Sequence, residues 1–198
     1  MEAARVSAMR GHEVILFEAA SRLGGQILLT AKGGWRKDMI GIADWLEAEL
    51  KVLGIDIQLD SYAESADVLA LDPDIIIAAT GGLPSTILPN DEGDGIGSVW
   101  DALSGHANPS GRVLIFDAIG GHTALSLAEK LTGSVDELTF VTSDRLVGRA
   151  IGVQNVPVNL RNLTRAGVRI LTDRALNGVR IDGNERVARD RHSFTREI

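Results

Sequence analysis

Short apolar runs alternate with amphipathic segments along most of the chain. In the first half this pattern predicts, in order, a helix over 2–10, a strand over 13–17, a helix over 35–53, a strand over 55–59, a short helix over 65–71 and a strand over 73–82. The last of these, PDIIIAATGG, is a continuous β-branched run, which is typical of a parallel strand buried on both faces. A segment rich in Gly, Pro and Asp, residues 84–110, then separates two halves.

The second half begins with the same alternation. Its pattern predicts, in order, a strand over 111–118, a helix over 124–131, a strand over 136–142, a helix over 156–167, a strand over 168–171 and two strands within 175–188. The pair Asp182-Gly183 indicates a hairpin turn between the last two strands. Strands that alternate with helices predict an α/β fold with a mainly parallel sheet, here as two Rossmann-like nucleotide-binding units. We place the units at 1–107 and 108–187, and expect 188–198 to begin the return to the first unit.

The two halves form an internal repeat. HEVILFE (12–18) aligns with DELTFVT (136–142), so Glu18 is equivalent to Thr142. At the same offset the preceding helices align, with Met1 on Leu125. The second half carries a complete strand and loop before that helix, and the first half carries nothing before Met1. The repeat therefore predicts that the first unit lacks its opening strand and glycine loop.

Glu18 ends the apolar strand that follows this first helix. In a dinucleotide-binding fold an acid about 20 residues after the G-x-G-x-x-G loop accepts hydrogen bonds from ribose hydroxyls. Glu18 has this position if such a loop precedes Met1. The alternative is a solvated charge at a strand end. The following Gly24-Gly25-Gln26 and the later Thr80-Gly81 favour the ribose-binding interpretation, because small residues at strand ends let a dinucleotide approach the backbone.

The second unit keeps only part of the fingerprint. Its three glycine positions fall on Ile119, Gly121 and Ala124, and Thr142 stands at the position of the ribose acid. Isoleucine does not readily take the backbone conformation that glycine provides at the first position. These substitutions disfavour NAD(P)H binding in this half and favour a structural role.

Charge and composition narrow the function classes. The formal net charge of −7 argues against nucleic acid or an anionic membrane as partner. The chain has no cysteine, which excludes disulfides, a redox C-x-x-C and iron–sulfur ligation by this chain. Its four histidines do not pair at metal-ligand spacing, so we expect no metal site. No apolar run is long enough to span a membrane and no signal peptide pattern is present, so a cytoplasmic protein is expected.

Four segments together carry a family resemblance: EAARVSAMRGHEVILFEAASRLGGQILL, WRKDMIGIADWLEAEL, PDIIIAATGGLP and SVWDALSG. They resemble the C-terminal region of the NADH:flavin oxidoreductase family that includes trimethylamine dehydrogenase, histamine dehydrogenase and 2,4-dienoyl-CoA reductase. The likeness covers residues 2 to about 187 and is greatest to the amine-demethylating branch. Family members carry an FMN-containing TIM barrel, a 4Fe–4S cluster and a C-terminal FAD/NAD(P)-type region. The chain resembles an interior piece of that last region.

The resemblance implies roles for six residues. Glu18 would face the ribose of FAD or ADP, Gly24, Gly25 and Gln26 would approach the dinucleotide, and Thr80 and Gly81 would close over it. FMN and the 4Fe–4S cluster would belong to parent regions outside this chain. No residue here is expected to act as catalytic acid, base or nucleophile, so the chain alone is expected to show no amine-dependent dye reduction.

Two functions therefore stay open at this point. The chain is either a cofactor-binding module of a flavin-dependent oxidoreductase that acts on an N-methylated amine or an unsaturated substrate, or a non-catalytic fragment that self-associates through an exposed sheet edge.

Arg36-Lys37 begins a predicted helix, where positive charge is mildly unfavourable. A solvated pair is the expectation there, and a phosphate contact is the alternative.

Overall fold

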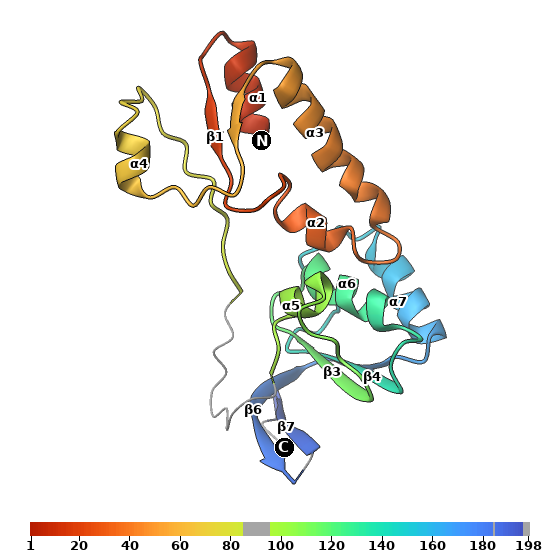
Figure 1. The fold of residues 1–198 in the computed structure, drawn as a ribbon. Helices are drawn as coiled ribbons and strands as arrows, with labels where there is room; N and C mark the ends of the chain where they lie inside the picture. Colours follow the sequence, from red (N-terminus) through yellow and green to blue (C-terminus); the bar gives the residue numbers. More distant parts are fainter. Residues whose placement is uncertain (85–95, 184, 196–198) are drawn as a thin grey trace. The chain divides into compact units, whose positions relative to one another are not determined.

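The structure is a computed structural model that describes residues 1–84, 96–183 and 185–195 (Figure 1). It is an α/β fold with parallel sheets, as the sequence predicts. The chain divides into two compact units. Unit 1 comprises Met1–Ala31 and Lys37–Leu83, and unit 2 comprises Lys32–Arg36 and Pro84–Ile198.

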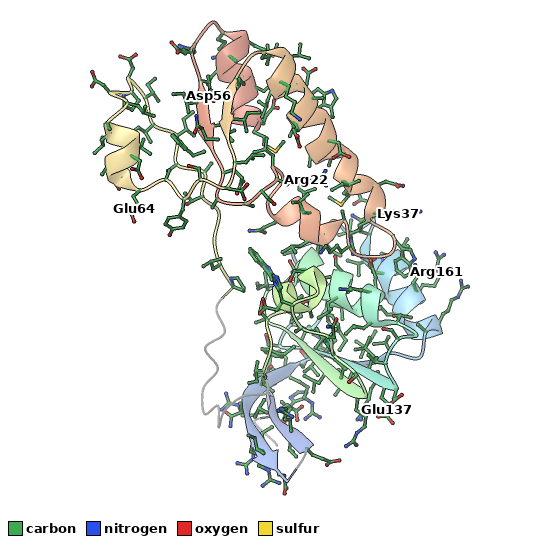
Figure 2. All side chains as sticks on the ribbon, in the orientation of Figure 1. Arg22, Lys37, Asp56, Glu64, Glu137 and Arg161 are labelled. Carbon is green, nitrogen blue, oxygen red and sulfur yellow. The ribbon has the colours of Figure 1, made fainter. Side chains whose placement is uncertain are left out.

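Unit 1 contains a two-stranded parallel sheet. Its elements are α1 (Glu2–Met9), β1 (Ile15–Phe17), α2 (Gln26–Thr30), the 3₁₀ helix η1 (Lys37–Met39), α3 (Ile40–Val52), β2 (Asp56–Gln58) and α4 (Ser65–Leu69). β1 pairs with β2, with Ile15 opposite Asp56. Glu64, labelled in Figure 2, caps α4: its side chain accepts from the backbone of Asp67, whose carboxylate accepts from the Glu64 N–H at 2.9 Å. The elements predicted up to residue 71 are thus all present, and α2 is a further helix that the pattern did not predict.

A small apolar cluster holds unit 1 together. Leu23, Leu50 and Ile55 are its buried centre. Partly buried side chains from α1, from the two strands and from the end of α3 pack around it: Met1, Ala4, Ala8, Val14, Leu16, Leu53 and Ile57. Arg5 adds a polar contact between the helices, because its guanidinium lies 5.2 Å from the centre of the Trp45 ring on α3.

The predicted buried strand over 73–82 is wrong. This segment has no strand structure, and Ile75, Ile76 and Ile77 are 74%, 55% and 60% exposed. A strand buried on both faces needs a neighbouring strand and covering helices. In the described part of unit 1, only β1 and β2 pair with each other, so this segment has no ladder to join.

Unit 2 contains a three-stranded parallel sheet and an antiparallel hairpin. Its elements are α5 (Val99–Ser104), β3 (Arg112–Asp117), α6 (His122–Leu131), β4 (Glu137–Thr142), α7 (Val156–Arg165), β5 (Arg169–Leu171), β6 (Arg174–Asp182) and β7 (Glu185–His192). The sheet order is β3-β4-β5. β6 pairs with β7, with Asp182 opposite Glu185, so the predicted hairpin is confirmed. Residue 184 of its turn lies outside the described residues.

The sequence repeat reappears in the strand register. Ile15 of β1 and Thr139 of β4 are equivalent in the repeat, and each begins a parallel pairing with the strand that follows it. Ile15 lies opposite Asp56, and Thr139 lies opposite Arg169. In both halves the chain passes through a helix between the paired strands, as a connection between parallel strands requires. The carboxyl ends of β1 and β4 are therefore equivalent positions.

The segment Lys32–Arg36 is fixed within unit 2 by a buried ion pair. Arg36 Nη1 lies 2.7 Å from Glu129 Oε1 and donates to Ser126 Oγ at 3.0 Å. The two charged side chains are only 11% and 2% exposed. Gly33 is packed against the same helix, because a Cβ there would lie 3.2 Å from Glu129 Oε2. The expectation of a solvated Arg36-Lys37 pair is thus wrong for Arg36, whose guanidinium donates to side chains of the two helices over 122–131 and 156–165, whereas Lys37 is exposed.

Candidate functional site

Glu18 lies where β1 ends, at the carboxyl edge of the small parallel sheet. Its backbone N–H donates to Gln58 O at 2.9 Å and its carbonyl accepts from Ser61 N at 3.0 Å, so the main chain is fixed on both sides. Within the half-buried side chain, Oε1 accepts from Ala20 N at 3.0 Å. Oε2 accepts from no described residue. The carboxylate is therefore oriented by one hydrogen bond and keeps one oxygen for a donor such as a hydroxyl.

The turn Leu23-Gly24-Gly25-Gln26 follows Glu18 and begins α2. Leu23 belongs to the buried cluster of unit 1, which fixes the start of the turn. Gly24 has a φ of +128°, and a Cβ on it would lie 2.9 Å from Leu28 Cδ2. Gly25 has no atom within 4 Å of the position of a Cβ. Glycine at 24 is thus required by packing, whereas Gly25 and the exposed Gln26 present an open surface.

An ion pair ties this turn to the helix behind it. Arg22 and Asp44 of α3 form the pair, and Figure 2 shows Arg22 beside the turn. Both side chains are about half exposed, so the pair contributes at most about 1 kcal/mol to the free energy of unfolding. The buried Leu23, rather than this pair, is what holds the turn in place.

Thr80 and Gly81 are exposed and lie in the segment that forms no strand. Gly81 has a φ of +71°. Neither residue forms a hydrogen bond with any other described residue. Glu18 and the 24–26 turn therefore lie close together in the sequence, between the end of β1 and the start of α2, and no hydrogen bond among the described residues joins Thr80 or Gly81 to either. The role of all six residues stays a prediction.

Asp117 was missed by the sequence reasoning. It ends β3, the strand that precedes the degenerate glycine loop, and it is 3% exposed. Its Oδ1 accepts from Ile119 N at 3.1 Å and from Gly120 N at 2.9 Å. Burial raises the pKa of this carboxyl; the two N–H donors oppose that shift and the charge of Asp144 adds to it. An acid at the end of an otherwise apolar strand, in the run FDAIGG, was the available signal.

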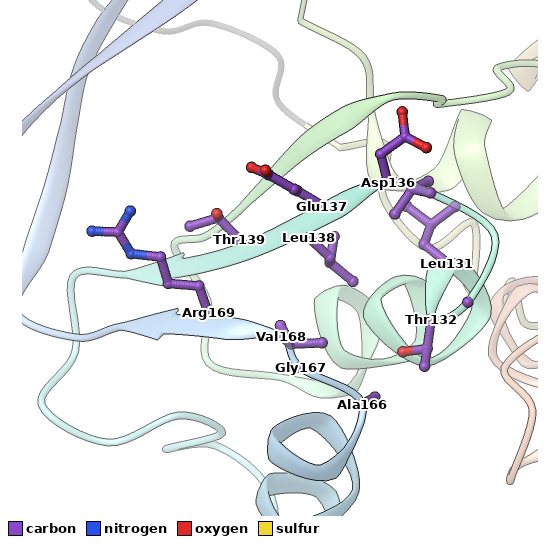
Figure 3. A pocket seen from close by; sticks show the side chains of 12 residues that line it. Leu131, Thr132, Asp136, Glu137, Leu138, Thr139, Ala166, Gly167, Val168 and Arg169 are labelled. Atoms are coloured by element: carbon purple, nitrogen blue, oxygen red, sulfur yellow. The ribbon is translucent and has the colours of Figure 1, made fainter.

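Two cavities lie away from these strand ends. One, of about 320 Å³, is at the opposite edge of the unit 2 sheet, where β4 and β5 begin (Figure 3). Figure 3 shows it between the end of α6, represented by Leu131 and Thr132, and the start of β5 at Arg169. The other, of about 240 Å³, lies where β1 and β2 begin. Because ligands of open parallel sheets bind at the carboxyl ends of the strands, neither cavity is the candidate site.

Two further observations limit the chemistry of the described residues. They contain no group of three or more His, Asp or Glu side chains arranged to hold a metal ion. They also contain no helix with the length and apolar content needed to cross a bilayer.

The chain is similar to two curated redox enzymes. It is 40% identical over 188 residues to a probable N-methylproline demethylase of Rhizobium meliloti (strain 1021), which covers 95% of this chain and 28% of that protein. It is 40% identical over 202 residues to an N,N-dimethylglycine/sarcosine dehydrogenase of Chromohalobacter salexigens, which covers 98% of this chain and 29% of that protein. The chain thus spans less than a third of the length of these relatives. No family model matches it.

Solved structures share the fold. A 2-naphthoyl-CoA reductase aligns with a TM-score of 0.83 at 24% identity, over 96% of this chain and 29% of that one. Histamine dehydrogenase from Rhizobium sp. 4-9 aligns with a TM-score of 0.77 at 18% identity, over 99% of this chain and 32% of that one.

The solved structures show the α/β fold of this chain, and the sequence relatives at 38–40% identity show the class of protein of which this chain spans a part. Within that class it belongs to the NADH:flavin oxidoreductase family, as the four sequence segments had indicated.

Proposed function

We propose that unit 1 is the main part of the FAD- or ADP-binding module of a flavin-dependent oxidoreductase. The observation that carries this proposal is the Glu18 carboxylate, held at the carboxyl end of a parallel strand with one oxygen available. Acids at this position in nucleotide-binding folds accept hydrogen bonds from ribose hydroxyls. The module would extend over 1–107, with 108–187 as an NAD(P)-type unit and 188–198 returning to the first.

The described residues fit part of such a cofactor. Glu18 Oε2 is free to accept from a ribose hydroxyl, and Gly25 offers backbone that no side chain covers. Residues 1–14 contain no G-x-G-x-x-G loop, so these residues themselves supply none of the pyrophosphate contacts of such a loop. Binding by unit 1 would therefore rest on the ribose and on the open turn at Gly25. Bound FAD would supply electron transfer at its flavin ring.

The relatives suggest the class of reaction for the whole protein. Two of them are named for N-methylated substrates, N-methylproline and N,N-dimethylglycine or sarcosine. A third, from Caballeronia cordobensis, is named as an alkene reductase and demethylase and is 38% identical over 200 residues. We propose oxidation of an N-methylated amine, or reduction of an unsaturated substrate, with the chemistry carried out outside residues 1–198.

Calorimetric titration of the purified chain with FAD and with ADP tests the cofactor proposal. We expect micromolar binding of at least one ligand, and a loss of about ten- to one hundredfold in affinity for Glu18→Ala, because a hydrogen bond to a charged group contributes about 1.5–3 kcal/mol. Glu13→Ala is the matched control, since Glu13 is an exposed acid before the same strand. Binding that Glu18→Ala leaves unchanged, or no binding of either ligand, contradicts the proposal.

Self-association is the second candidate function, favoured by the exposed run Ile75, Ile76 and Ile77. An exposed apolar segment of β-branched residues, with backbone groups that no strand pairs, tends to pair with another chain. We expect sedimentation velocity without ligand to show a weight-average size that rises with protein concentration, and Ile76→Lys to abolish the rise. Val153→Lys, at an exposed apolar position of unit 2, is expected to leave it unchanged. A chain that stays monomeric at all concentrations would exclude this candidate.

A further inference from the structure

The loop between β3 and α6 has the place of a phosphate-binding loop. It connects a parallel strand to the amino end of a ten-residue helix, and the fingerprint aligns its residues 119–124 with a G-x-G-x-x-G motif. In such loops the backbone N–H groups point at the pyrophosphate and donate hydrogen bonds to it. In unit 2 the partners of these N–H groups decide whether the loop can bind a phosphate.

Two of them are already bonded to a side chain of the same loop. The N–H groups of Ile119 and Gly120 both donate to Oδ1 of Asp117, at 3.1 and 2.9 Å. The carboxylate is 3% exposed, so it lies inside the loop and not at its surface. Hydrogen bonds from N–H groups to a carboxylate are about twice as strong as those between neutral groups. The loop thus holds an anion that its own chain supplies.

The loop between β4 and α7 packs against the same turn and covers it. Gly120 O accepts from Ala150 N at 2.9 Å, and a Cβ on Gly120 would lie 3.2 Å from Arg149 N, so this backbone covers Gly120. Gly120 has a φ of +72°, and the same Cβ would lie 3.0 Å from Asp144 Oδ2. A second carboxylate therefore borders the loop, paired at 3.2 Å with the exposed Arg149.

The negative charges of the two carboxylates make the binding of a phosphate in this loop unfavourable. Oδ2 of Asp117 is buried and accepts no hydrogen bond from the described residues, and Oδ2 of Asp144 has the exposed Arg149 as its ion-pair partner. A pyrophosphate entering this loop would meet two carboxylates in a region of low dielectric, where like charges repel strongly. It would also have to pass Ile119, which is 74% exposed at the first glycine position.

From these contacts we propose that Asp117 is an internal substitute for phosphate, and that its bonds to Ile119 and Gly120 close the loop of unit 2 to dinucleotides. Asp117 and its partners all lie in unit 2. Failure of FAD or ADP to bind unit 1 would therefore leave this closure untouched.

The test is a titration of ¹⁵N-labelled chain with inorganic pyrophosphate and with NADH, followed through the amide resonances of Ile119, Gly120 and Gly121. For the unaltered chain we expect no shift of these amides at millimolar ligand. Asp117→Ala removes the acceptor and is expected to bind pyrophosphate at least tenfold more tightly, with shifts at Gly120 and Gly121. Asp136→Ala, an acid at the opposite edge of the sheet, is the control and should behave as the unaltered chain.

Asp117→Asn separates hydrogen bonding from charge. Asparagine keeps an oxygen that can accept from both N–H groups, so this variant is expected to stay closed. Opening of Asp117→Asn to the same degree as Asp117→Ala would overturn the proposal, because repulsion and not occupancy would then exclude phosphate. Two other results would also overturn it. One is a change in these amide resonances when pyrophosphate or NADH is added to the unaltered chain. The other is a folded Asp117→Ala variant that binds pyrophosphate no more tightly than the unaltered chain.

A measurement on the unaltered chain covers the case in which Asp117→Ala does not fold. The amide resonances of Ile119 and Gly120 should move with pH along the same curve as the Asp117 carboxyl carbon. The ionisable groups at this loop are Asp117 itself, His122, Asp144 and Arg149, so the carboxyl carbon of Asp144 and the ring of His122 are followed in parallel. Amides that follow only Asp144, or neither acid, contradict the proposed closure.

Discussion

Arg36→Ala is expected to lower the free energy of unfolding of unit 2 by about 3–5 kcal/mol, because it leaves a buried carboxylate without its partner. Glu129 is 2% exposed, and its Oε2 already accepts no hydrogen bond from the described residues. Without Arg36 its Oε1 also loses the 2.7 Å ion pair. Hydrogen exchange of the α6 and β4 amides measures the change in local stability.

The control for this variant removes an ion pair that is exposed and not buried. Arg22→Ala removes the exposed pair with Asp44 and is expected to cost less than about 1 kcal/mol. Equal losses for the two variants would mean that burial of Glu129 does not set the cost.

The same variant has a defined pH dependence. Burial raises the pKa of Glu129 above its ordinary value, against the opposing effect of Arg36. A carboxyl with a raised pKa in the folded state binds its proton more tightly there, so it favours folding at low pH and loses this contribution as pH rises through the raised value. Arg36→Ala removes the opposing charge, so its stability deficit should be largest at neutral pH and shrink below the ordinary pKa of glutamate. A deficit that stays constant with pH would contradict this assignment.

Leu50→Ala is expected to destabilise unit 1 by about 2–5 kcal/mol through loss of buried area and the cavity that it leaves. Leu50 is 0% exposed and packs with Leu23 and Ile55 at the centre of the only apolar cluster described in unit 1. Because Leu23 begins the turn that contains Gly24 and Gly25, we also expect weaker binding of any ligand that depends on that turn. Urea unfolding, followed by hydrogen exchange of the α1 and β1 amides, measures the stability.

The matched control lies two residues along the same helix. Val52 is 84% exposed, so Val52→Ala is expected to change the stability by less than about 0.5 kcal/mol. A loss for Leu50→Ala no larger than that of Val52→Ala would show that the cluster does not hold unit 1 together.

The local sequence pattern predicted correctly those elements whose structure is determined by residues close together in the sequence. The helix over 2–10, the strand before Glu18 and the hairpin around Asp182-Gly183 are all found at or close to their predicted limits. Local pattern failed over 73–82, because an apolar β-branched run becomes a strand only when a neighbouring strand is present to pair with it. The sequence of the segment carries no information about that neighbour.

The residues of the candidate sites also differ in whether the local sequence could predict their position and contacts. Glu18 could be placed at a strand end from the strand that precedes it. Arg36 could not be recognised as buried, because its partners Ser126 and Glu129 are 90 and 93 residues further along the chain. Asp117 was visible as an acid after an apolar run, but its bonds to two N–H groups depend on a turn that the degenerate glycine pattern did not specify.

The assignment of Lys32–Arg36 to unit 2 has a practical consequence for dissecting the protein. A polypeptide that begins at residue 84 contains Glu129 but not its cation, and one that ends at residue 83 contains Arg36 but not its acceptors. Cutting the chain at that apparent boundary therefore leaves the buried Glu129 carboxylate without its cation in one piece and residues 32–36 without their partners in the other. Supplying residues 32–36 as a separate peptide should restore part of the lost stability to the C-terminal piece, in the manner of a split protein.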